Sequence, residues 1–358
     1  MMIVRNETAV LPRLAASLEG QIDRWTIVDT GSIDETPAVA RAVFSYAPGE
    51  VIQDKWRGYG PSRNVALKAA EPLSDWLLFI DADETFHGFL DAKDLEADAD
   101  VIEAEQHYGP LRFWLPRLVK SGQGWEWRGR AHEYLSRPGG HGRRLRTDSF
   151  WIEHHADGGN RTTKFEREIE LLTEDWADNP GDPRTAFYLG RSYDEAGRSP
   201  EAVTWYRRRI SLEGWDEERF YSRWRLGVCL LRTGAAAEGC GLLWHSWAER
   251  PERAEPLVTL AEFYRASELW PLAWLAADLA FRHCGAQPAD GAGARAYPDG
   301  LFVDSTATEG RAAFEASISA WYVGQHDRGR QLTEHLLTRD DLPELVRAAV
   351  ETNRSFYA

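Results

Sequence analysis

Apolar and polar positions follow two different rhythms along this chain. In the first part, short apolar runs alternate with segments in which apolar residues recur every three or four positions, the patterns of buried strands and amphipathic helices. They predict strands at residues 1–5, 25–28, 51–52 and 77–80, and helices at 8–20, 37–46 and 62–70. Strands and helices that alternate at this spacing form a mostly parallel sheet, with ligand loops at the carboxyl ends of its strands.

The later part of the chain has long helical patterns with an internal repeat. Leu189-Gly190, Leu226-Gly227 and Leu260-Ala261 recur at offsets of 37 and 34 residues, and a turn position and then a small residue follow each of them. This is the period of tetratricopeptide-like helix pairs, which stack because no single pair buries its own apolar face. The pattern predicts an α/β domain at residues 1–160 and an all-α repeat domain at 161–358.

One segment, 285–306, interrupts the repeat. It is rich in Gly, Ala, Pro and Asp, yet it contains the apolar run Leu301-Phe302-Val303 near its end. An apolar anchor after a long polar loop predicts a lid or a docked excursion, and a plain insertion between repeats is the alternative.

Length and composition agree with two domains. The 358 residues exceed what one core usually serves. No run of eighteen apolar residues and no apolar amino-terminal stretch occurs, which predicts a cytoplasmic protein without integral membrane contact. Cys229, Cys240 and Cys284 lack the spacing of metal ligands, which fits a reducing compartment and no structural zinc.

The charge is strongly negative overall but uneven. A net charge of -15 disfavours a protein that grips nucleic acid over its whole surface. Residues 112–146, however, contain nine Arg or Lys and only two acids, Glu126 and Glu133. This stretch predicts a surface that screens a diphosphate or attracts an anionic acceptor, and a solvated basic loop is the alternative.

The most informative motif is an apolar strand that ends abruptly in carboxylates, at residues 77–84 (LLFIDADE). Asp81 and Asp83 place two hard oxygen ligands where an open α/β sheet presents its ligand crevice. Such a pair suits a divalent cation together with a diphosphate and points to nucleotide-sugar chemistry. An acidic helix cap is the plainer interpretation of the motif taken alone.

Three further motifs accompany this one in a fixed order. The four blocks are residues 2–7 (MIVRNE), 27–36 (IVDTGSIDET), 60–67 (GPSRNVAL) and 79–84 (FIDADE). Together they resemble the inverting family 2 glycosyltransferases, whose GT-A fold is a Rossmann-like α/β domain. The combination is far more specific than any single block.

The resemblance implies a role for each matched position. The implied donor-binding residues are Val4, Asn6, Glu7, Asp29, Arg63, Asn64 and Asp81. Asp81 is expected to face the ribose or a metal-bound water, and Asp83 to ligate Mn²⁺ or Mg²⁺ directly. His154 is the expected third ligand, with His155 as its rival, and an imidazole in an oxygen-rich shell favours Mn²⁺.

The acceptor side is implied by residues 117–120 and 125–133 (WEWRGRAHE), which are similar to a segment of one branch of that family. Glu133 is the expected catalytic base, since an inverting transfer needs a group that takes the proton of the attacking acceptor. Trp127, Arg130 and His132 are the expected acceptor-side residues. A purely structural pair of His132 and Glu133 is the alternative, because the family's usual Asp-containing base motif is missing.

The rest of the chain is also similar to a branch in which the catalytic domain runs directly into helical repeats. The matching segments are residues 153–161 (EHHADGGNR), 164–167 (KFER), 301–303 (LFV) and 353–357 (NRSFY). Bacterial peptide S-glycosyltransferases share this two-part architecture.

The leading hypothesis is therefore a metal-dependent inverting glycosyltransferase. It would move a sugar from a nucleotide diphosphate sugar, expected to be a UDP-hexose, to a protein, peptide, glycan or other acceptor, with protein or peptide favoured. A homodimer through the helical domain is a further hypothesis. The alternative is a catalytically inactive scaffold that binds a partner. A nucleotidyltransferase would need a Gly-rich phosphate loop, which residues 5–8 do not offer.

Overall fold

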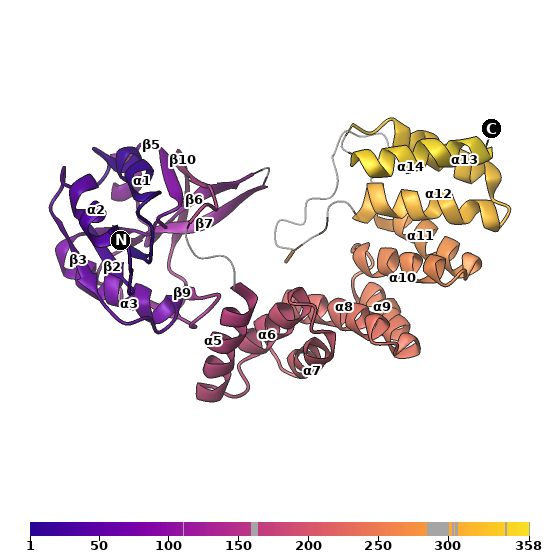
Figure 1. The fold of residues 1–358 in the computed structure, drawn as a ribbon, viewed down its shortest axis with the longest axis horizontal. Helices are drawn as coiled ribbons and strands as arrows, with labels where there is room; N and C mark the ends of the chain where they lie inside the picture. Colours follow the sequence, from indigo (N-terminus) through magenta and orange to yellow (C-terminus); the bar gives the residue numbers. More distant parts are fainter. Residues whose placement is uncertain are drawn as a thin grey trace. The chain divides into compact units, whose positions relative to one another are not determined.

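The computed structural model describes residues 1–109, 111–158, 164–284, 301–302, 304, 307–340 and 342–357. The chain divides into two units, Met1–Asp178 and Asn179–Ala358 (Figure 1). Helix α5 (Lys164–Asp178) therefore belongs to the first unit, whereas the sequence placed the domain boundary at 160/161. The physical reason is that Arg130 binds Asp175 and Asp178 on this helix.

The first unit begins with a parallel sheet of the order β1-β2-β3, as the sequence predicted. Its strands are β1 (Met2–Val4), β2 (Trp25–Asp29) and β3 (Gly49–Gln53). Met1 lies between Leu78 and Ile80: its amino group donates to the carbonyl oxygen of Leu78, and its own carbonyl oxygen accepts from the N–H of Ile80. This pattern is that of a parallel pair. The ends of β1, β2 and the strand before Asp81 consequently meet at one edge.

A second, five-stranded sheet of the order β4-β7-β6-β10-β5 completes the first unit. Its strands are β4 (Trp76–Leu78), β5 (Glu84–Gly88), β6 (Val101–Tyr108), β7 (Leu111–Lys120) and β10 (Arg144–His154). Only β10 and β6 run parallel, and the other neighbours are antiparallel. The parallel arrangement thus describes the first sheet, and the second sheet is mixed. A small hairpin of β8 (Glu126–Arg128) and β9 (Tyr134–Ser136) forms a separate two-stranded sheet.

Short helices pack around these sheets, and the apolar spacing predicted the first three of them. They are α1 (Leu11–Leu18), α2 (Thr36–Val43), α3 (Tyr59–Ala70) and α4 (Ala92–Glu96), with a 3₁₀ turn at Glu71–Leu73. Leu11, Leu14 and Leu18 of α1 are fully buried in one core with Ile27 and Phe150. Because α1 contributes every third or fourth residue to this core, it holds the second sheet against the first.

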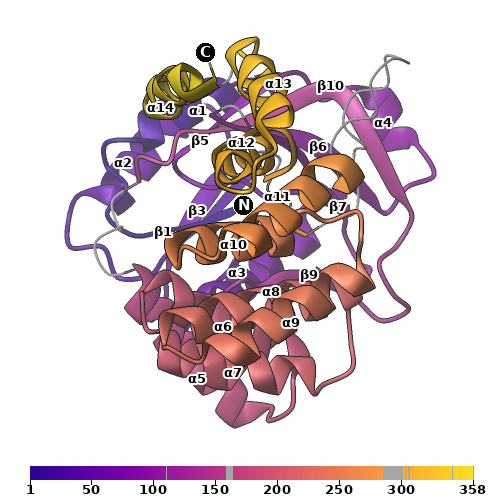
Figure 2. The same ribbon diagram turned by 90° about the vertical axis from the view of Figure 1, so that its right-hand side faces the viewer.

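The second unit is a series of helix pairs, confirming the predicted repeat (Figure 2). Its helices are α6 (Pro183–Glu195), α7 (Ser199–Ile210), α8 (Asp216–Arg232), α9 (Ala236–Glu249), α10 (Glu255–Ala266), α11 (Trp270–Cys284), α12 (Ala312–Tyr322), α13 (His326–Leu337) and α14 (Glu344–Arg354). A π-helical turn (Ala307–Arg311) and a 3₁₀ turn (Ser355–Tyr357) complete it.

The repeat positions have clear structural roles. The turns of successive pairs contain Gly197, Gly234 and Gly324, with φ of 74°, 86° and 74°, and Glu268 takes the same left-handed conformation at 57°. A Cβ atom on Gly190 would lie 2.7 Å from the ring of Tyr206. The small residues are therefore required where two helices of a pair approach each other most closely.

The interrupting segment is described in part. Residues 285–300, 303 and 305–306 lie outside the described residues, as do residues 159–163 of the first unit. Leu301 and Phe302 lie against α6 and α8 of their own unit. Among the helices of the described ranges, none is both long and apolar enough to cross a membrane.

Candidate active site

A pocket of about 320 Å³ lies at the edge where β1 and β4 end. Its lining combines acidic and cationic groups with two aromatic rings. The lining residues are the carboxylates Glu7, Asp81 and Asp83 with the imidazole of His154, the arginines Arg5, Arg63 and Arg167, and the aromatic residues Trp56 and Tyr59. A larger cavity of about 480 Å³, lined by Leu18, Trp25 and Leu78 among others, is near the opposite ends of the strands and holds none of the expected site residues.

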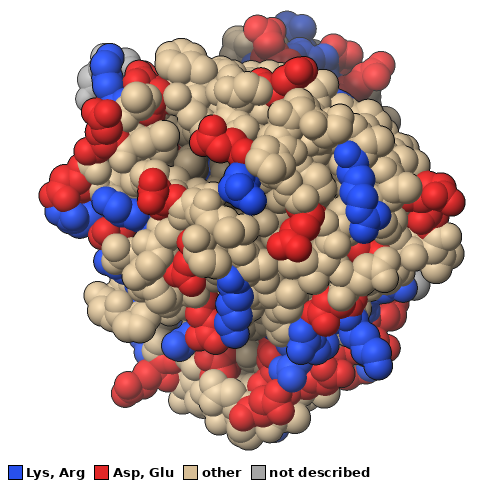
Figure 3. Space-filling view, turned by 90° about the vertical axis from the view of Figure 1, so that its left-hand side faces the viewer, with Lys and Arg blue, Asp and Glu red and all other residues tan. Residues whose placement is uncertain are grey.

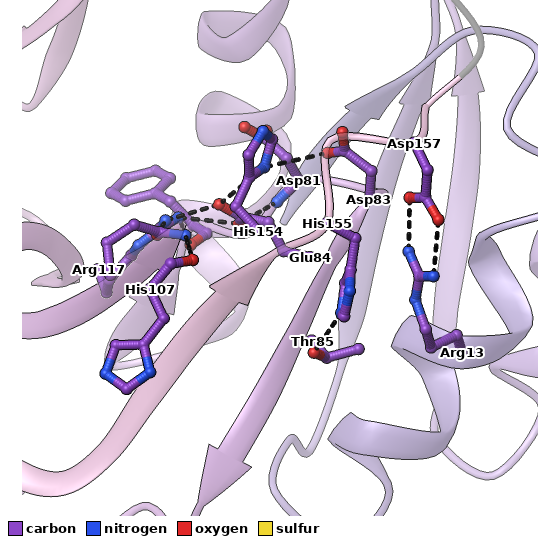
Figure 4. Close-up of polar contacts among 12 residues, drawn as sticks. Arg13, Asp81, Asp83, Glu84, Thr85, His107, Arg117, His154, His155 and Asp157 are labelled. Carbon is purple, nitrogen blue, oxygen red and sulfur yellow. Dashed lines mark hydrogen bonds and ion pairs between the residues drawn. The ribbon is translucent and has the colours of Figure 1, made fainter. Parts of the chain in front are cut away.

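Asp83 and His154 face each other in this pocket (Figure 4). Asp83 follows β4, His154 ends β10, and their atoms Oδ1 and Nδ1 are 3.6 Å apart. Successive residues of a strand point to opposite sides. Accordingly, the next residue, His155, turns away and its Nε2 lies 2.9 Å from the hydroxyl of Thr85. Of the two histidines, His154 is the one beside the carboxylates.

The surroundings of Gly158 suit a cation. A Cβ atom on this residue would lie 3.3 Å from Oδ2 of Asp83 and 3.2 Å from Oε2 of Glu7, so two carboxylates face one narrow space. In the described parts of the chain, no three His, Cys, Asp or Glu side chains are grouped as a metal-binding set. Mn²⁺ and Mg²⁺ sites that use substrate phosphates need only one or two protein carboxylates. The donor set therefore fits a cation whose shell a diphosphate completes.

Arg63 on α3 joins two of the expected site residues. Its Nη2 donates to Oδ1 of Asp81 at 2.7 Å, and its Nε donates to Oε1 of Glu133 at 2.8 Å. Burial raises the pKa of Asp81, but the charges of Arg63 and Arg117 outweigh burial and hold that pKa below its ordinary value. For Arg63, burial lowers the pKa, and the two carboxylates more than reverse this effect. Asp81 is thus kept ionised, with one oxygen bound to an arginine.

A buried pair beneath the pocket holds the turn that carries Asp81. Arg117 of β7 donates to both carboxylate oxygens of Glu84, at 2.7 and 3.0 Å, and also contacts the side chain of Gln106. Glu84 Oε2 in turn accepts from the backbone N–H of Asp81 at 2.8 Å. Burial raises the pKa of Glu84 to about 7 against the attraction of Arg117, and the charge of Asp81 adds to the rise.

Three expected donor-binding residues do not line the pocket but support it. Asn6, with φ of 59°, accepts from the N–H of Ile33, and Asp29 accepts from Ser32. Both thereby hold the loop after β2. Asn64 exchanges two hydrogen bonds with the backbone of Trp127, at 2.7 and 2.8 Å. The other four residues of this set, Val4, Glu7, Arg63 and Asp81, do line the pocket.

The expected acceptor-side residues also make contacts within the first unit. Arg130 binds Asp175 and Asp178 of α5, and Nε2 of His132 lies 3.4 Å from Glu168 of the same helix. Trp127 packs edge-on against Phe79 and beneath the guanidinium of Arg63. These contacts join the hairpin of β8 and β9 to α3 and α5. None of the three residues, nor Glu133, lines the pocket.

The basic stretch 112–146 is largely neutralised by acids, all of which except Glu126 come from other segments. Its paired cations are Arg117 with Glu84, Arg128 with Glu126, Arg130 with Asp175, Arg137 with Asp100, Arg143 with Asp98, and Arg144 and Arg146 with Glu103. Acidic and basic side chains are likewise interspersed on the face in Figure 3. The expectation of a local positive surface for an anionic acceptor is therefore corrected, because most of the partners come from distant positions in the sequence.

The sequence interpretation missed several residues of the pocket. The guanidinium of Arg167 lies 5.2 Å from the ring centre of Trp56, and Tyr59 meets that ring edge-on at 4.9 Å. Burial raises the pKa of Tyr59, so its hydroxyl stays protonated. Arg5 and Arg167 fall within the motifs at 2–7 and 164–167, but those motifs do not show which side chains face the pocket. Nothing in the sequence pointed to Trp56.

Comparison with known proteins gives the family that the first unit matches. Residues 1–107 match the family model described as glycosyl transferase family 2. The chain thus carries a family 2 glycosyltransferase domain, followed by TPR-like helical pairs. These findings support a glycosyltransferase.

The curated relatives are similar over limited segments. A TPR repeat-containing protein of Synechococcus elongatus is 42% identical over 84 residues, which are 23% of this chain and 19% of that protein. An uncharacterized glycosyltransferase of Rickettsia felis is 30% identical over 106 residues, 30% of this chain and 34% of that protein. The matches thus span about a third or less of each of these relatives.

Two of the similar solved structures cover about half of this chain. The C-terminal part of a TPR repeat-containing protein from Cytophaga hutchinsonii is 11% identical, with a TM-score of 0.41 over 55% of this chain and 68% of that one. A crystal structure of MamA is 14% identical, with a TM-score of 0.38 over 49% of this chain and 87% of that one.

Proposed function

We propose that this protein is a metal-dependent inverting glycosyltransferase that transfers a sugar from a nucleotide diphosphate sugar, a UDP-hexose in our proposal, to a protein or peptide. The observation that carries the proposal is the mixed lining of the 320 Å³ pocket. Carboxylates and an imidazole suit a divalent cation, whereas arginines and aromatic rings suit phosphates and a nucleobase. A nucleotide diphosphate sugar needs both kinds of group at once.

Asp83 and His154 are the proposed protein ligands of Mn²⁺ or Mg²⁺, with Glu7 beside them. Asp81, which Arg63 keeps ionised, is proposed to face the ribose or a metal-bound water with its remaining oxygen. When bound, the cation would neutralise the charge of the leaving diphosphate. Mutual repulsion of the carboxylates in the absence of a cation is a further reason to expect metal-dependent donor binding.

Arg5 and Arg167 are the proposed anion-binding residues of the pocket. Within the described residues, neither has a carboxylate partner, whereas Arg63 is bound to two. An unpaired guanidinium in a pocket is well suited to a bidentate contact with phosphate. Trp56, already stacked beneath Arg167, offers an aromatic face for the nucleobase.

Glu133 is the residue whose role changes most. Sequence reasoning made it the catalytic base, yet its carboxylate is bound to Arg63 and is only 13% exposed. Because Arg63 occupies Oε1 of this nearly buried carboxylate, the contact favours a positioning role through Arg63. The base role remains a prediction, and the variants in the Discussion separate the two.

The test is donor binding and turnover with purified full-length protein. Thermal shifts with a panel of nucleotide diphosphate sugars are measured with and without Mn²⁺, since a ligand at a hundredfold excess over its Kd adds about 2.7 kcal/mol to the free energy of unfolding. We expect a Mn²⁺-dependent shift with UDP-sugars that Asp83→Asn abolishes. Asp148→Asn, a change of an exposed carboxylate on β10, serves as the matched control and should leave the shift unchanged.

Turnover separates the enzyme from the scaffold alternative. Release of UDP from the preferred donor in the presence of Mn²⁺ supports the enzyme. No shift and no UDP release with any donor would leave the inactive scaffold as the better description. A full shift with Asp83→Asn would contradict the assignment of the metal ligand.

A further inference from the structure

A buried cluster of charged side chains in the second unit holds the backbone of Leu301. Oε2 of Glu217 accepts from the N–H of Leu301 at 3.0 Å, and Nη2 of Arg253 lies 3.5 Å from its carbonyl oxygen. Glu255 accepts from the N–H of Asp304 at 3.2 Å. Glu217, Arg253 and Glu255 are only 8%, 2% and 2% exposed and bind one another. The cluster therefore contacts backbone peptide groups, which are present in a polypeptide of any sequence.

Beside this cluster, an aromatic cradle holds the ring of Phe302. The ring lies parallel to that of Phe187 at 6.4 Å and meets Tyr221 at 5.4 Å. The guanidinium of Arg191 stands over it at 4.1 Å, a close cation–π contact. The cradle comes from α6 and α8, and it selects an aromatic side chain because only a flat ring satisfies both stacking and the cation.

The segment that occupies the cradle is held less firmly than the residues that form the cradle. Phe302 has φ of 50°, a conformation that bulky L-residues rarely adopt, and its side chain is still 42% exposed. Phe187, Arg191, Tyr221, Glu217 and Glu255, in contrast, lie on regular helices, and Arg253, in the loop before α10, is bound to both glutamates. A peptide that is free to relax its backbone would present the same ring without this strain.

We infer that the surface formed by Arg191, Phe187 and Tyr221 with the Glu217–Arg253–Glu255 cluster is a peptide-docking site. Its partner is a polypeptide segment with an aromatic residue, whose neighbouring backbone N–H groups bind Glu217 and Glu255. The segment containing Leu301, Phe302 and Asp304 is its occupant in cis. This inference concerns binding alone and does not depend on the proposed glycosyl transfer.

The covalent link gives the cis segment an advantage that a free peptide must overcome. A tethered segment competes at an effective concentration on the order of millimolar. Free peptide should therefore bind the wild-type chain weakly, and removal of the Phe302 ring should uncover the cradle. Phe302→Ala leaves the receptor residues of α6, α8 and α10 and of the loop before α10 unchanged, which makes it the direct test.

The probe is a fluorescent peptide with the sequence of residues 299–306 (DGLFVDST), titrated with full-length protein and followed by fluorescence anisotropy. We expect Phe302→Ala to bind it at least about tenfold more tightly than the wild type. Adding Arg191→Ala to Phe302→Ala should remove this gain. Arg198→Ala is the matched control, because Arg198 also stands over a ring, that of Tyr193, and binds Glu201 of the helix that it precedes, α7.

A peptide with alanine in place of phenylalanine should bind none of these proteins. Equal affinity of the wild type and Phe302→Ala, or full binding after Arg191→Ala, would show that the segment is a fixed structural anchor and would overturn the inference. Circular dichroism checks that each variant folds. If Phe302→Ala does not fold, a photo-crosslinking version of the peptide is used with the wild-type chain. Crosslinks on α6 and α8 then support the site, and crosslinks elsewhere refute it.

Discussion

Replacing Arg63 by methionine tests both the electrostatics of the pocket and the role of Glu133. Arg63→Met keeps much of the apolar side chain but removes the cation between Asp81 and Glu133. The side chains of Arg63 and Glu133 are 12% and 13% exposed, so one carboxylate is left nearly buried without its partner. Breaking such a pair costs about 3–5 kcal/mol. Asp81, at 38% exposed, regains water, which places the expected loss near the lower limit.

The second arm of the experiment is Glu133→Gln. The amide keeps a hydrogen-bond acceptor for Arg63 Nε and loses the charge, so the free energy of unfolding should fall by about 1–2 kcal/mol. Because the two residues are in contact, the double variant should be less destabilised than the sum of the single variants, by about 1–2 kcal/mol. Urea unfolding, followed in the transition of the first unit, measures all three values.

Arg137→Met is the matched control. Arg137 binds Asp100 at 3.1 Å, stands over the ring of Trp125 at 5.0 Å and is 14% exposed, yet it does not line the pocket. It should lose stability much as Arg63→Met does while keeping donor affinity. Arg63→Met, in contrast, should also lose donor binding, measured by calorimetry with UDP and Mn²⁺. Unchanged stability of Arg63→Met, or strict additivity in the double variant, would refute the electrostatic reasoning.

Turnover then decides the role of Glu133. If Glu133 positions Arg63, Glu133→Gln should weaken donor binding and keep most of kcat. If Glu133 is the base, kcat should fall by about 10²–10⁴-fold at an unchanged donor Kd.

Three further predictions concern the framework. Gly58→Ala should lower the free energy of unfolding, measured by urea titration, by about 3 kcal/mol, because φ is 109° and the new Cβ would lie 2.6 Å from that of Arg130. Gly122→Ala is the control: φ is 72° and no atom lies within 4 Å of the new Cβ, so the loss should be only about 1 kcal/mol. Burial raises the pKa of Tyr46 to about 12, so above pH 10 the unfolded chain loses the phenol proton before the folded chain does. The stability advantage of the wild type over Tyr46→Phe should therefore shrink as the pH rises from 10 towards 12. An advantage that does not change with pH would contradict this prediction. Glu268→Gly should raise the melting temperature of the second unit, measured by calorimetry, because Glu268 has φ of 57° in a turn where the other repeats use glycine. The expected gain in the free energy of unfolding is about 0.5–1 kcal/mol. A lower melting temperature would show that the side chain of Glu268 contributes more to stability than its backbone conformation costs.

Local sequence patterns were sufficient to predict a feature where a single type of side chain serves a single structural purpose. The strand that ends at Asp81 and Asp83 was readable because a buried strand must be apolar and a ligand loop polar. The spacing of Gly197, Gly234 and Gly324 was readable because a left-handed turn favours glycine. The sequence did not show that Arg5 and Arg167 line the pocket, since a single arginine in a motif carries no sign of what it faces.

Partnerships between distant residues were also beyond the sequence. The excess of positive charge at 112–146 suggested an anionic surface contact, until Glu84, Asp100 and Glu103 proved to be its partners. Likewise, Glu133 is a carboxylate in an acceptor-like motif, and only the fold brings it to Arg63, 70 positions away.

The sequence by itself determined the two-part organisation, the α/β and repeat classes, and the acidic turn at Asp81 and Asp83, because periodicity and burial act between neighbouring positions. The tertiary structure alone decided which of two adjacent histidines faces Asp83, which arginines enter the pocket, and what occupies the cradle of Arg191. These outcomes depend on strand alternation and on contacts between segments far apart in the chain. Packing of the whole fold sets such contacts, and no local pattern records them.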